Sequence, residues 1–206
     1  MHPFVSDLAQ RLLTLNKRHQ KHDISSILAR INFPKQPCVL DFGCGTGLFA
    51  RFLQGLGLKY VGYDVDEKLI AYAGKRSPGV TFTTSLDVAT ASGPYDLILV
   101  NCCFHHIPDE ECQNILRWFA TILQPSGHVL FIDILRPAQR ISAMHDFFMC
   151  MEQGKHVRSR EENLALLSGS VHALEPTVTR SYCFGLRSRF NGFCNDVLTC
   201  VLRAQA

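Results

Sequence analysis

The chain has 206 residues, of which 47% are hydrophobic and 19% are charged. This length and composition are typical of one globular domain with a buried core, and they argue against a second full domain. Lysine and arginine number 21 against 18 acidic residues, a net charge of +3, so overall charge gives no indication of a nucleic-acid-binding protein.

No run of about 18 apolar residues is present, and the first residues do not follow the pattern of a secretion leader. The 9 cysteines are scattered through apolar stretches without any CxxC pair, so we interpret them as free thiols of a reducing compartment. We therefore expect a cytoplasmic protein without a disulfide framework, a membrane segment or a metal site.

The N-terminal part is predicted to be helical. Apolar residues recur there at helical spacing in two stripes, Phe4, Val5, Leu8, Leu12 and Leu15 followed by Ile24, Ile27, Leu28 and Ile31. Pro34 and Pro37 close this section.

From Cys38 onward, short β-rich runs alternate with amphipathic helical stretches. Strands are predicted at 38–42, 59–64, 80–84, 95–101 and 128–135, and helices at 48–56, 66–76 and 109–123. This alternation predicts a doubly wound α/β sheet whose ligand crevice lies at the carboxyl ends of the strands.

The last seventy or so residues mix both patterns. Helices are predicted at 140–151 and at 159–169, the second capped by Ser159, and β runs at 177–184 and 195–203. If the two β runs pair with each other, they form an antiparallel pair that closes one edge of the sheet.

The strongest motif is the glycine-rich turn Asp41-Phe42-Gly43-Cys44-Gly45-Thr46-Gly47, between a predicted strand and a predicted helix. Glycines there let the backbone approach a ligand closely, and the helix N-terminus offers N–H groups to an anion. A dinucleotide fingerprint, G-x-G-x-x-G, would need a third glycine where Leu48 stands, which disfavours a nicotinamide or flavin enzyme.

Asp41 to Gly47 resembles the first motif of class I S-adenosylmethionine-dependent methyltransferases, an acidic residue followed by x-G-x-G-x-G. Asp64, seventeen positions beyond Gly47, stands where this family keeps an acid that accepts both ribose hydroxyls of the cofactor. The resemblance continues through Ser85-Leu86-Asp87-Val88, Asn101 and Leu123 to Leu130, in the family's order. It covers about half of the chain, residues 38 to about 134.

The resemblance implies a Rossmann-like methyltransferase fold: a seven-stranded, mostly parallel sheet with an antiparallel edge strand and helices on both faces. It would form a single domain, 1–206, with an N-terminal helical cap at 1–36, a cofactor-binding core at 37–135, a helical acceptor-pocket segment at 136–175 and a C-terminal strand pair at 176–206. The implied cofactor is S-adenosyl-L-methionine, which leaves as S-adenosyl-L-homocysteine. The implied cofactor-binding residues are Asp41, Gly43, Cys44, Gly45, Gly47, Asp64, Val65, Asp87, Val88 and Asn101.

Several of these acids also have a structural explanation. Asp66 fits a helix N-cap better than a ligand contact. Asp41 could hold the glycine loop by accepting backbone N–H bonds, and Asp87 could begin a turn instead of reaching the adenine. For Asp64 the ligand interpretation is favoured because loop and acid occur together.

A candidate general base follows the fourth predicted strand, in the run Asn101 to Ile107. Many small-molecule methyltransferases that this chain resembles carry a similar His-His-Ile run there. His105 or His106, with a slight preference for His105, could take a proton from the acceptor, or the pair could only anchor the loop or line the pocket. Asp133, at the end of the fifth predicted strand, could face the same crevice or cap a loop.

A basic run from Lys155 to Arg160, with Arg180, Arg187 and Arg189, could bind an acidic acceptor or RNA, or form a solvated face. We predict methyl transfer to an oxygen or nitrogen of a small, partly hydrophobic organic acceptor, with neither nucleic acid nor membrane as partner. The alternatives are a methyltransferase acting on RNA, protein or lipid, and a non-catalytic S-adenosylmethionine-binding regulator.

Overall fold

A computed structural model describes residues 17–136, 155–169, 174–184 and 195–204. The chain divides into two compact units, residues 1–96 and 97–206. The first predicted apolar stripe and the predicted helix at 140–151 lie outside the described residues.

The first unit is built on parallel strands in the order β3-β2-β1. Their bounds are β1 (Cys38–Phe42), β2 (Lys59–Tyr63) and β3 (Thr81–Thr83). Cys38 pairs with Lys59 and Phe42 with Tyr63, so β1 and β2 end level with each other. The loops that follow these two strands therefore begin at the same edge, as parallel strands require.

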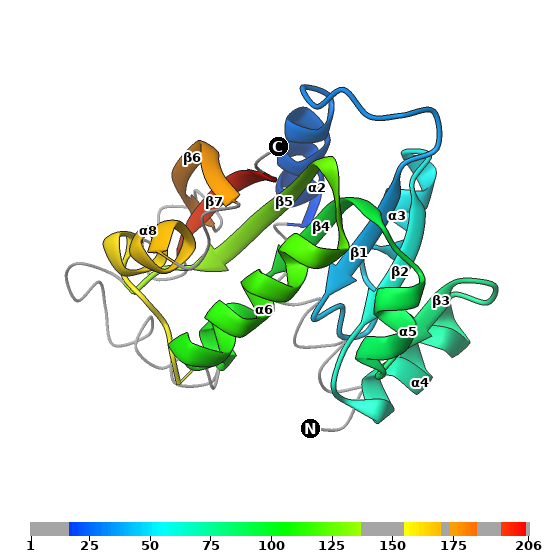
Figure 1. Cartoon of the computed structure of the whole chain (residues 1–206). Helices are drawn as coiled ribbons and strands as arrows, with labels where there is room; N and C mark the ends of the chain where they lie inside the picture. The colour runs from blue at the N-terminus through cyan, green and yellow to red at the C-terminus, as the bar shows by residue number, and fades with distance from the viewer. Residues whose placement is uncertain (1–16, 137–154, 170–173, 185–194, 205–206) are drawn as a thin grey trace. The chain divides into compact units, whose positions relative to one another are not determined.

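Four helices surround these strands in the described part of the unit (Figure 1): α2 (Lys17–Leu28), α3 (Ala50–Gly55), α4 (Glu67–Arg76) and α5 (Leu86–Ala91). The Asp66 side chain accepts the backbone N–H groups of Lys68 and Leu69, which confirms the predicted helix cap. The Ser85 hydroxyl caps α5 in the same way by accepting from Val88.

Tight packing around Phe82 explains two of the glycines in this unit. A Cβ atom at Gly62 would lie 2.7 Å from Cδ1 of Phe82 and 2.9 Å from Sγ of Cys44. A Cβ atom at Gly47 would lie 2.8 Å from the same ring, and its φ of +69° also favours glycine. The Phe82 ring thus fills the space that side chains at these two positions would need.

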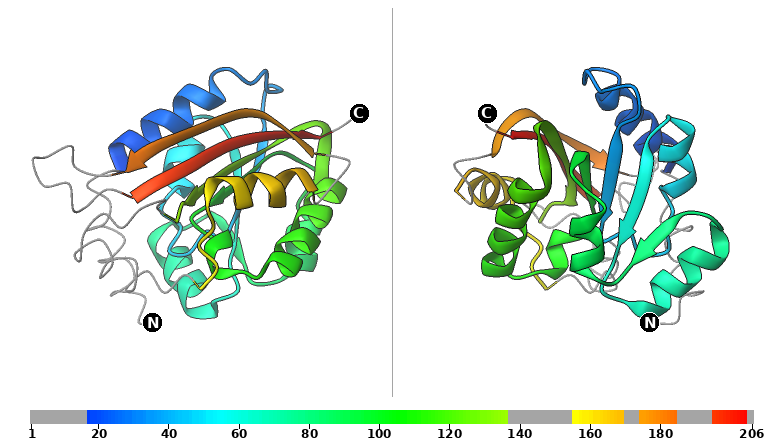
Figure 2. Two further views of the ribbon diagram at one scale, coloured as in Figure 1. Left: turned by 90° about the vertical axis from the view of Figure 1, so that its left-hand side faces the viewer. Right: turned by 45° about the vertical axis from the view of Figure 1, so that its right-hand side comes forward.

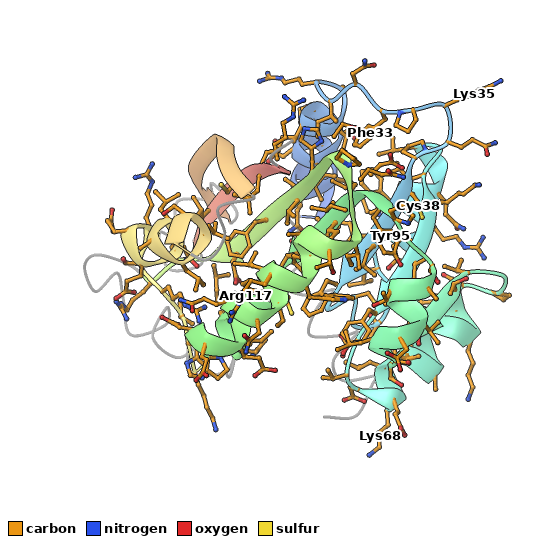
Figure 3. The ribbon with its side chains drawn as sticks, viewed as in Figure 1. Phe33, Lys35, Cys38, Lys68, Tyr95 and Arg117 are labelled. Carbon is orange, nitrogen blue, oxygen red and sulfur yellow. The ribbon has the colours of Figure 1, made fainter. Side chains whose placement is uncertain are left out.

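Strand β4 (Tyr95–Asn101) begins in the first unit and continues into the second. Its first residue, Tyr95, is buried and donates its hydroxyl to the carbonyl of Ala89 at 2.6 Å. Burial raises the pKa of Tyr95 to about 12. The Asp96 carboxylate accepts the backbone N–H of Cys38 at 2.8 Å, so the starts of β1 and β4 lie together; Figure 3 labels Cys38 and Tyr95 there.

The second unit has the strand order β4-β5-β7-β6. Its further strands are β5 (Leu123–Ile134), β6 (Leu174–Phe184) and β7 (Asn195–Ala204). Strand β7 is antiparallel to both β5 and β6, which confirms the predicted antiparallel pair; Figure 2 shows β6 and β7 as two long neighbouring strands. The backbone becomes extended at Leu123, directly after a helix, although pairing with β7 begins only at His128, where the sequence predicts the strand to start.

The helices of this unit are α6 (Asp109–Ile122), α8 (Arg160–Gly169) and the short 3-10 turn η2 (Phe104–His106). Ser159 and Glu162 form a capping box at the start of α8, because each side chain accepts the other residue's backbone N–H. The rings of Phe104, Phe119 and Phe131 meet in the core. Arg117, labelled in Figure 3, lies on the exposed side of α6.

The α/β class predicted from the alternating pattern is therefore confirmed. None of the helices among the described residues is both long enough and apolar enough to cross a membrane.

We expect Gly62→Ala to lower the free energy of unfolding by about 1–3 kcal/mol, because the new methyl group would overlap Phe82 and Cys44. Gly74→Ala is the control: nothing lies within 4 Å of the added Cβ, and the residue is inside α4. The free energy of unfolding of Gly74→Ala should rise by about 0.5–1 kcal/mol. Urea unfolding of both variants measures the difference, and wild-type stability of Gly62→Ala would contradict the packing described.

Candidate functional site

The glycine loop turns sharply at the end of β1. Gly43, Gly45 and Gly47 have φ values of 73°, 53° and 69°, which residues with a side chain rarely adopt. The backbone N–H groups of Gly43 and Cys44 both donate to the carbonyl of Tyr63, at 2.8 and 2.9 Å. The end of β2 therefore holds the start of the loop.

Asp64, the residue after β2, joins this loop to the start of α4. Its Oδ2 accepts the Gly45 N–H at 2.8 Å, and its Oδ1 accepts the Asp66 N–H at 3.0 Å. Burial raises the pKa of Asp64, while the N–H bonds from Asp66 and Gly45 lower it by stabilising the ionised form. Since each carboxylate oxygen can accept two hydrogen bonds, the half-buried carboxylate keeps acceptor capacity for hydroxyl groups.

Two segments that follow Asp64 in the chain carry exposed apolar side chains. Val65 is 79% exposed, and Leu86 and Val88 at the start of α5 are each 46% exposed. The two segments are neighbours because the Asp64 N–H donates to the carbonyl of Thr83 at 3.2 Å. Apolar groups beside a carboxylate suit a nucleoside, which has a flat apolar base and a hydroxyl-bearing sugar. Asp87 is exposed in the first turn of α5.

Asp41, in β1, and Cys44, within the loop, are both buried. Asp41 is 2% exposed, and its Oδ2 accepts the Tyr60 hydroxyl at 2.6 Å. Burial raises the pKa of Asp41 to about 7, against the effect of the Tyr60 hydrogen bond. Burial also raises the pKa of the Cys44 thiol far above its ordinary value. Both side chains thus belong to the buried interior next to the loop.

These residues fit S-adenosylmethionine as the predicted ligand. The fit rests on the left-handed glycines, on the two-sided anchoring of Asp64 and on the apolar surface at Val65 and Val88. Gly43, Gly45 and Gly47 would let the backbone approach the ligand, and Asp64 would receive its ribose hydroxyls.

The segment Phe104 to Ile107 of the second unit, here called the histidine turn, contains His105 and His106. Asp133, near the end of β5, holds this turn. Asp133 accepts the backbone N–H of His105 at 2.9 Å, and its Oδ1 lies 2.5 Å from Nδ1 of the His105 ring. Both side chains are 1% exposed. A carboxylate on Nδ1 fixes the orientation of the His105 ring.

His106, by contrast, is exposed. Its ring centroid lies 4.0 Å from that of His105. The ring is still partly shielded from water, and this partial burial and the adjacent His105 lower the pKa of His106. The Asp133 carboxylate raises it. An imidazole with a lowered pKa is neutral at physiological pH and can accept a proton.

Asn101 and Cys102 connect β4 to the histidine turn. Both are half-buried, and Cys102 has a φ of 52°, an uncommon value for a residue with a side chain. The Cys102 N–H donates to the carbonyl of Ile132 at 2.8 Å, so this bend is tied to β5. Cys102 and Cys103 are both partly buried.

Arg158 is the feature that sequence reasoning missed. It stands in the basic run 155–160, for which a ligand-binding or solvated face was expected, yet it is 5% exposed. Its guanidinium donates to the carbonyls of Phe104 and Ile107 and to the carboxylate of Asp109. The spacing of charges along the chain contains no signal for this burial, because its partners lie about fifty residues earlier. The side chains of Arg180, Arg187 and Arg189 lie outside the described part.

Comparison with known proteins places these features in a family. A family model described as "Methyltransferase domain" matches residues 16–167. The chain belongs to this methyltransferase family. The predicted membership in the class I S-adenosylmethionine-dependent methyltransferases is thereby confirmed, and with it S-adenosylmethionine as the family's cofactor.

Two curated relatives match a shorter part of the chain. A trans-aconitate 2-methyltransferase of Variovorax paradoxus is 38% identical over 106 residues, covering 49% of this chain and 40% of that protein. A ubiquinone biosynthesis O-methyltransferase of Thiobacillus denitrificans is 27% identical over 146 residues, covering 65% of this chain and 62% of that protein. The chain thus spans about half the length of the curated relatives it matches.

A solved S-adenosylmethionine-dependent methyltransferase from Methanosarcina mazei superposes with a TM-score of 0.64 at 18% identity, covering 84% of this chain and 94% of that one. This likeness confirms the predicted Rossmann-like methyltransferase fold.

We expect Asp64→Asn to weaken binding of S-adenosylhomocysteine by about 1–3 kcal/mol, because the ribose hydroxyls would lose a charged acceptor. Asp66→Asn is the matched control, since asparagine caps a helix as well as aspartate does and affinity should not change. Isothermal calorimetry measures both. Equal affinities for the two variants would refute the role of Asp64.

Asp41 should make stability depend on pH. Between the ordinary value of 3.8 and about 7, the folded chain keeps the Asp41 proton and the unfolded chain releases it. Stability therefore falls as pH rises through this window. Asp41→Asn stays neutral and can still accept the Tyr60 hydrogen bond.

Urea unfolding at about pH 5 and about pH 8 tests this expectation. The wild type should lose stability relative to Asp41→Asn at the higher pH. A difference between the two proteins that stays constant with pH would contradict the buried, protonated acid.

Proposed function

We propose that this protein transfers the methyl group of S-adenosylmethionine to an oxygen atom of a small organic acceptor, with His106 as the general base. The observation that carries this proposal is an exposed imidazole with a lowered pKa, backed by a buried His–Asp pair, in a chain of the methyltransferase family. Bound S-adenosylmethionine would supply a methyl group activated by its sulfonium.

An acceptor hydroxyl needs a group of the protein to remove its proton. A hydroxyl becomes a strong nucleophile as it loses its proton, and a positioned base typically contributes about 10²- to 10⁴-fold. His106 is exposed and so can reach an acceptor, whereas the ring of His105 is buried. This reverses the slight preference for His105 that the sequence suggested.

The His105–Asp133 pair acts as a support for His106. Asp133 holds both the backbone N–H and the ring of His105. The His105 ring in turn lies against the ring of His106 and keeps it in place. His105 also helps to hold His106 neutral, since two adjacent imidazoles disfavour a second positive charge.

In the first unit, we assign cofactor binding to Gly43, Gly45, Gly47, Asp64, Val65, Asp87 and Val88. Asp41 and Cys44 would act indirectly, because both are buried. In the second unit, Asn101, at the end of β4, is assigned to the methionine part of the cofactor, as the family resemblance implies.

The relatives favour oxygen as the methylated atom and a small molecule as the acceptor. One relative is named as an O-methyltransferase of ubiquinone biosynthesis, and another as acting on trans-aconitate. An acceptor panel should therefore contain phenols and carboxylic acids, with amines as the competing nitrogen class. RNA and protein substrates test the macromolecular alternative.

We expect radiolabelled methyl groups to appear on phenol or carboxylic acid acceptors. His106→Gln should lower kcat on a phenol by about 10²- to 10⁴-fold and leave the affinity for S-adenosylhomocysteine unchanged, because only proton transfer is lost. A carboxylic acid is already ionised at neutral pH, so methyl transfer to it should not depend on His106. The wild-type rate on a phenol should rise with pH as His106 loses its proton.

His22→Gln is the control for histidine removal, since His22 is a highly exposed residue of α2. Full activity of His106→Gln would sink the assignment of the base. Cofactor binding without transfer to any acceptor would favour the non-catalytic regulator instead.

A further inference from the structure

The Arg158 side chain is almost fully buried and contacts the histidine turn. Its Nη1 donates to the carbonyl of Phe104 at 2.9 Å, and its Nη2 to the carbonyl of Ile107 at 2.7 Å. These carbonyls come just before and just after the two histidines. One planar guanidinium therefore spans the turn and fixes the distance between its ends.

The neighbouring backbone adds to this contact. The N–H of His156 donates to the carbonyl of His105 at 2.9 Å, and the carbonyl of Arg158 accepts the N–H of Arg136 at 2.7 Å. Arg158 also forms a β-bridge with Leu135, directly after β5. The segment 156–158 is thus attached both to the histidine turn and to the end of the strand that carries Asp133.

Asp109 holds the guanidinium in its orientation. Its Oδ1 accepts from Nε of Arg158 at 2.9 Å and from Nη2 at 2.7 Å. The Asp109 carboxylate is 72% exposed, while the arginine side chain is 6% exposed. A buried cation with an acidic partner and two backbone carbonyls is satisfied without any bound substrate, so the guanidinium is committed to the protein itself.

We propose that Arg158 is the positioning residue of the histidine turn, holding His106 against His105 by bonding the carbonyls of Phe104 and Ile107. It acts through backbone geometry and touches neither cofactor nor acceptor. Only the consequence for turnover rests on the proposed function of His106; the effect on the conformation of the turn does not.

The position of His106 in this turn determines which groups influence its pKa. Partial burial and the His105 imidazole lower its pKa, and the Asp133 carboxylate raises it. If the turn loses its hold, His106 moves into water and away from His105, so the two lowering influences weaken. Loss of Arg158 should therefore shift the pKa of His106 upward, toward its ordinary value.

NMR titration of the His106 ring in the full chain tests this without any acceptor, the resonance being assigned by its absence in His106→Gln. We expect Arg158→Met to shift the His106 titration to higher pH while S-adenosylhomocysteine still binds. Arg136→Met is the matched control: it removes the same charge from the exposed Arg136–Glu162 ion pair, and the titration should stay at the wild-type value.

Asp109→Asn gives a second route if Arg158→Met does not fold, because Asp109 is exposed and only orients the guanidinium. It should shift the titration in the same direction by a smaller amount. An unchanged His106 titration in the folded Arg158→Met or Asp109→Asn variant, or an equal shift in Arg136→Met, would overturn the proposal.

Turnover separates this proposal from the function on which it partly rests. With an acceptor in hand, Arg158→Met should lower kcat by up to about 100-fold through misplacement of the base. If His106→Gln leaves turnover intact while Arg158→Met still shifts the titration, His106 is not the base and Arg158 remains the positioning residue of the turn.

Discussion

A strand that ends inside a protein leaves the next loop with backbone N–H groups that must find partners. In both units of this chain a carboxylate at a strand end supplies them. Asp64, just after β2, accepts N–H bonds from the glycine loop and from the start of α4. Asp133, near the end of β5, accepts the N–H of His105 and binds its ring. The two loops on which the proposed chemistry depends thus owe their shapes to these acids.

The three acids differ in burial, and burial decides whether a carboxylate can contact a ligand directly. Asp64 is half-buried, so its carboxylate can hold the loop and still accept a hydroxyl. Asp41 and Asp133 are 2% and 1% exposed, and their oxygens face Tyr60 and His105. Asp64 stands one residue beyond its strand, whereas Asp41 and Asp133 are within theirs, which explains the difference.

The histidine turn combines a rigid backbone with one exposed imidazole. Asp133 of β5 accepts a backbone N–H of the turn. The segment 156–158 donates hydrogen bonds to the carbonyls of Phe104, His105 and Ile107. The proposed base would need little reorganisation to accept a proton, since its orientation does not depend on the acceptor. Partial burial and the adjacent His105 lower the pKa of His106, which favours the neutral imidazole that accepts a proton.

Local features of this fold were predictable because they depend on residues close together in the chain. The cap at Asp66, the capping box at Ser159, the alternation of strands and helices and the glycine loop all follow from spacings of a few residues. The position of Asp64 was predictable through the family motif. The burial of His105 but not of His106, and the burial of Arg158, were not. Asp133 lies 28 residues from His105, and the partners of Arg158 lie 49 to 54 residues away. Which histidine is buried and which arginine is enclosed depends on how distant strands and helices pack, and no local spacing records that packing.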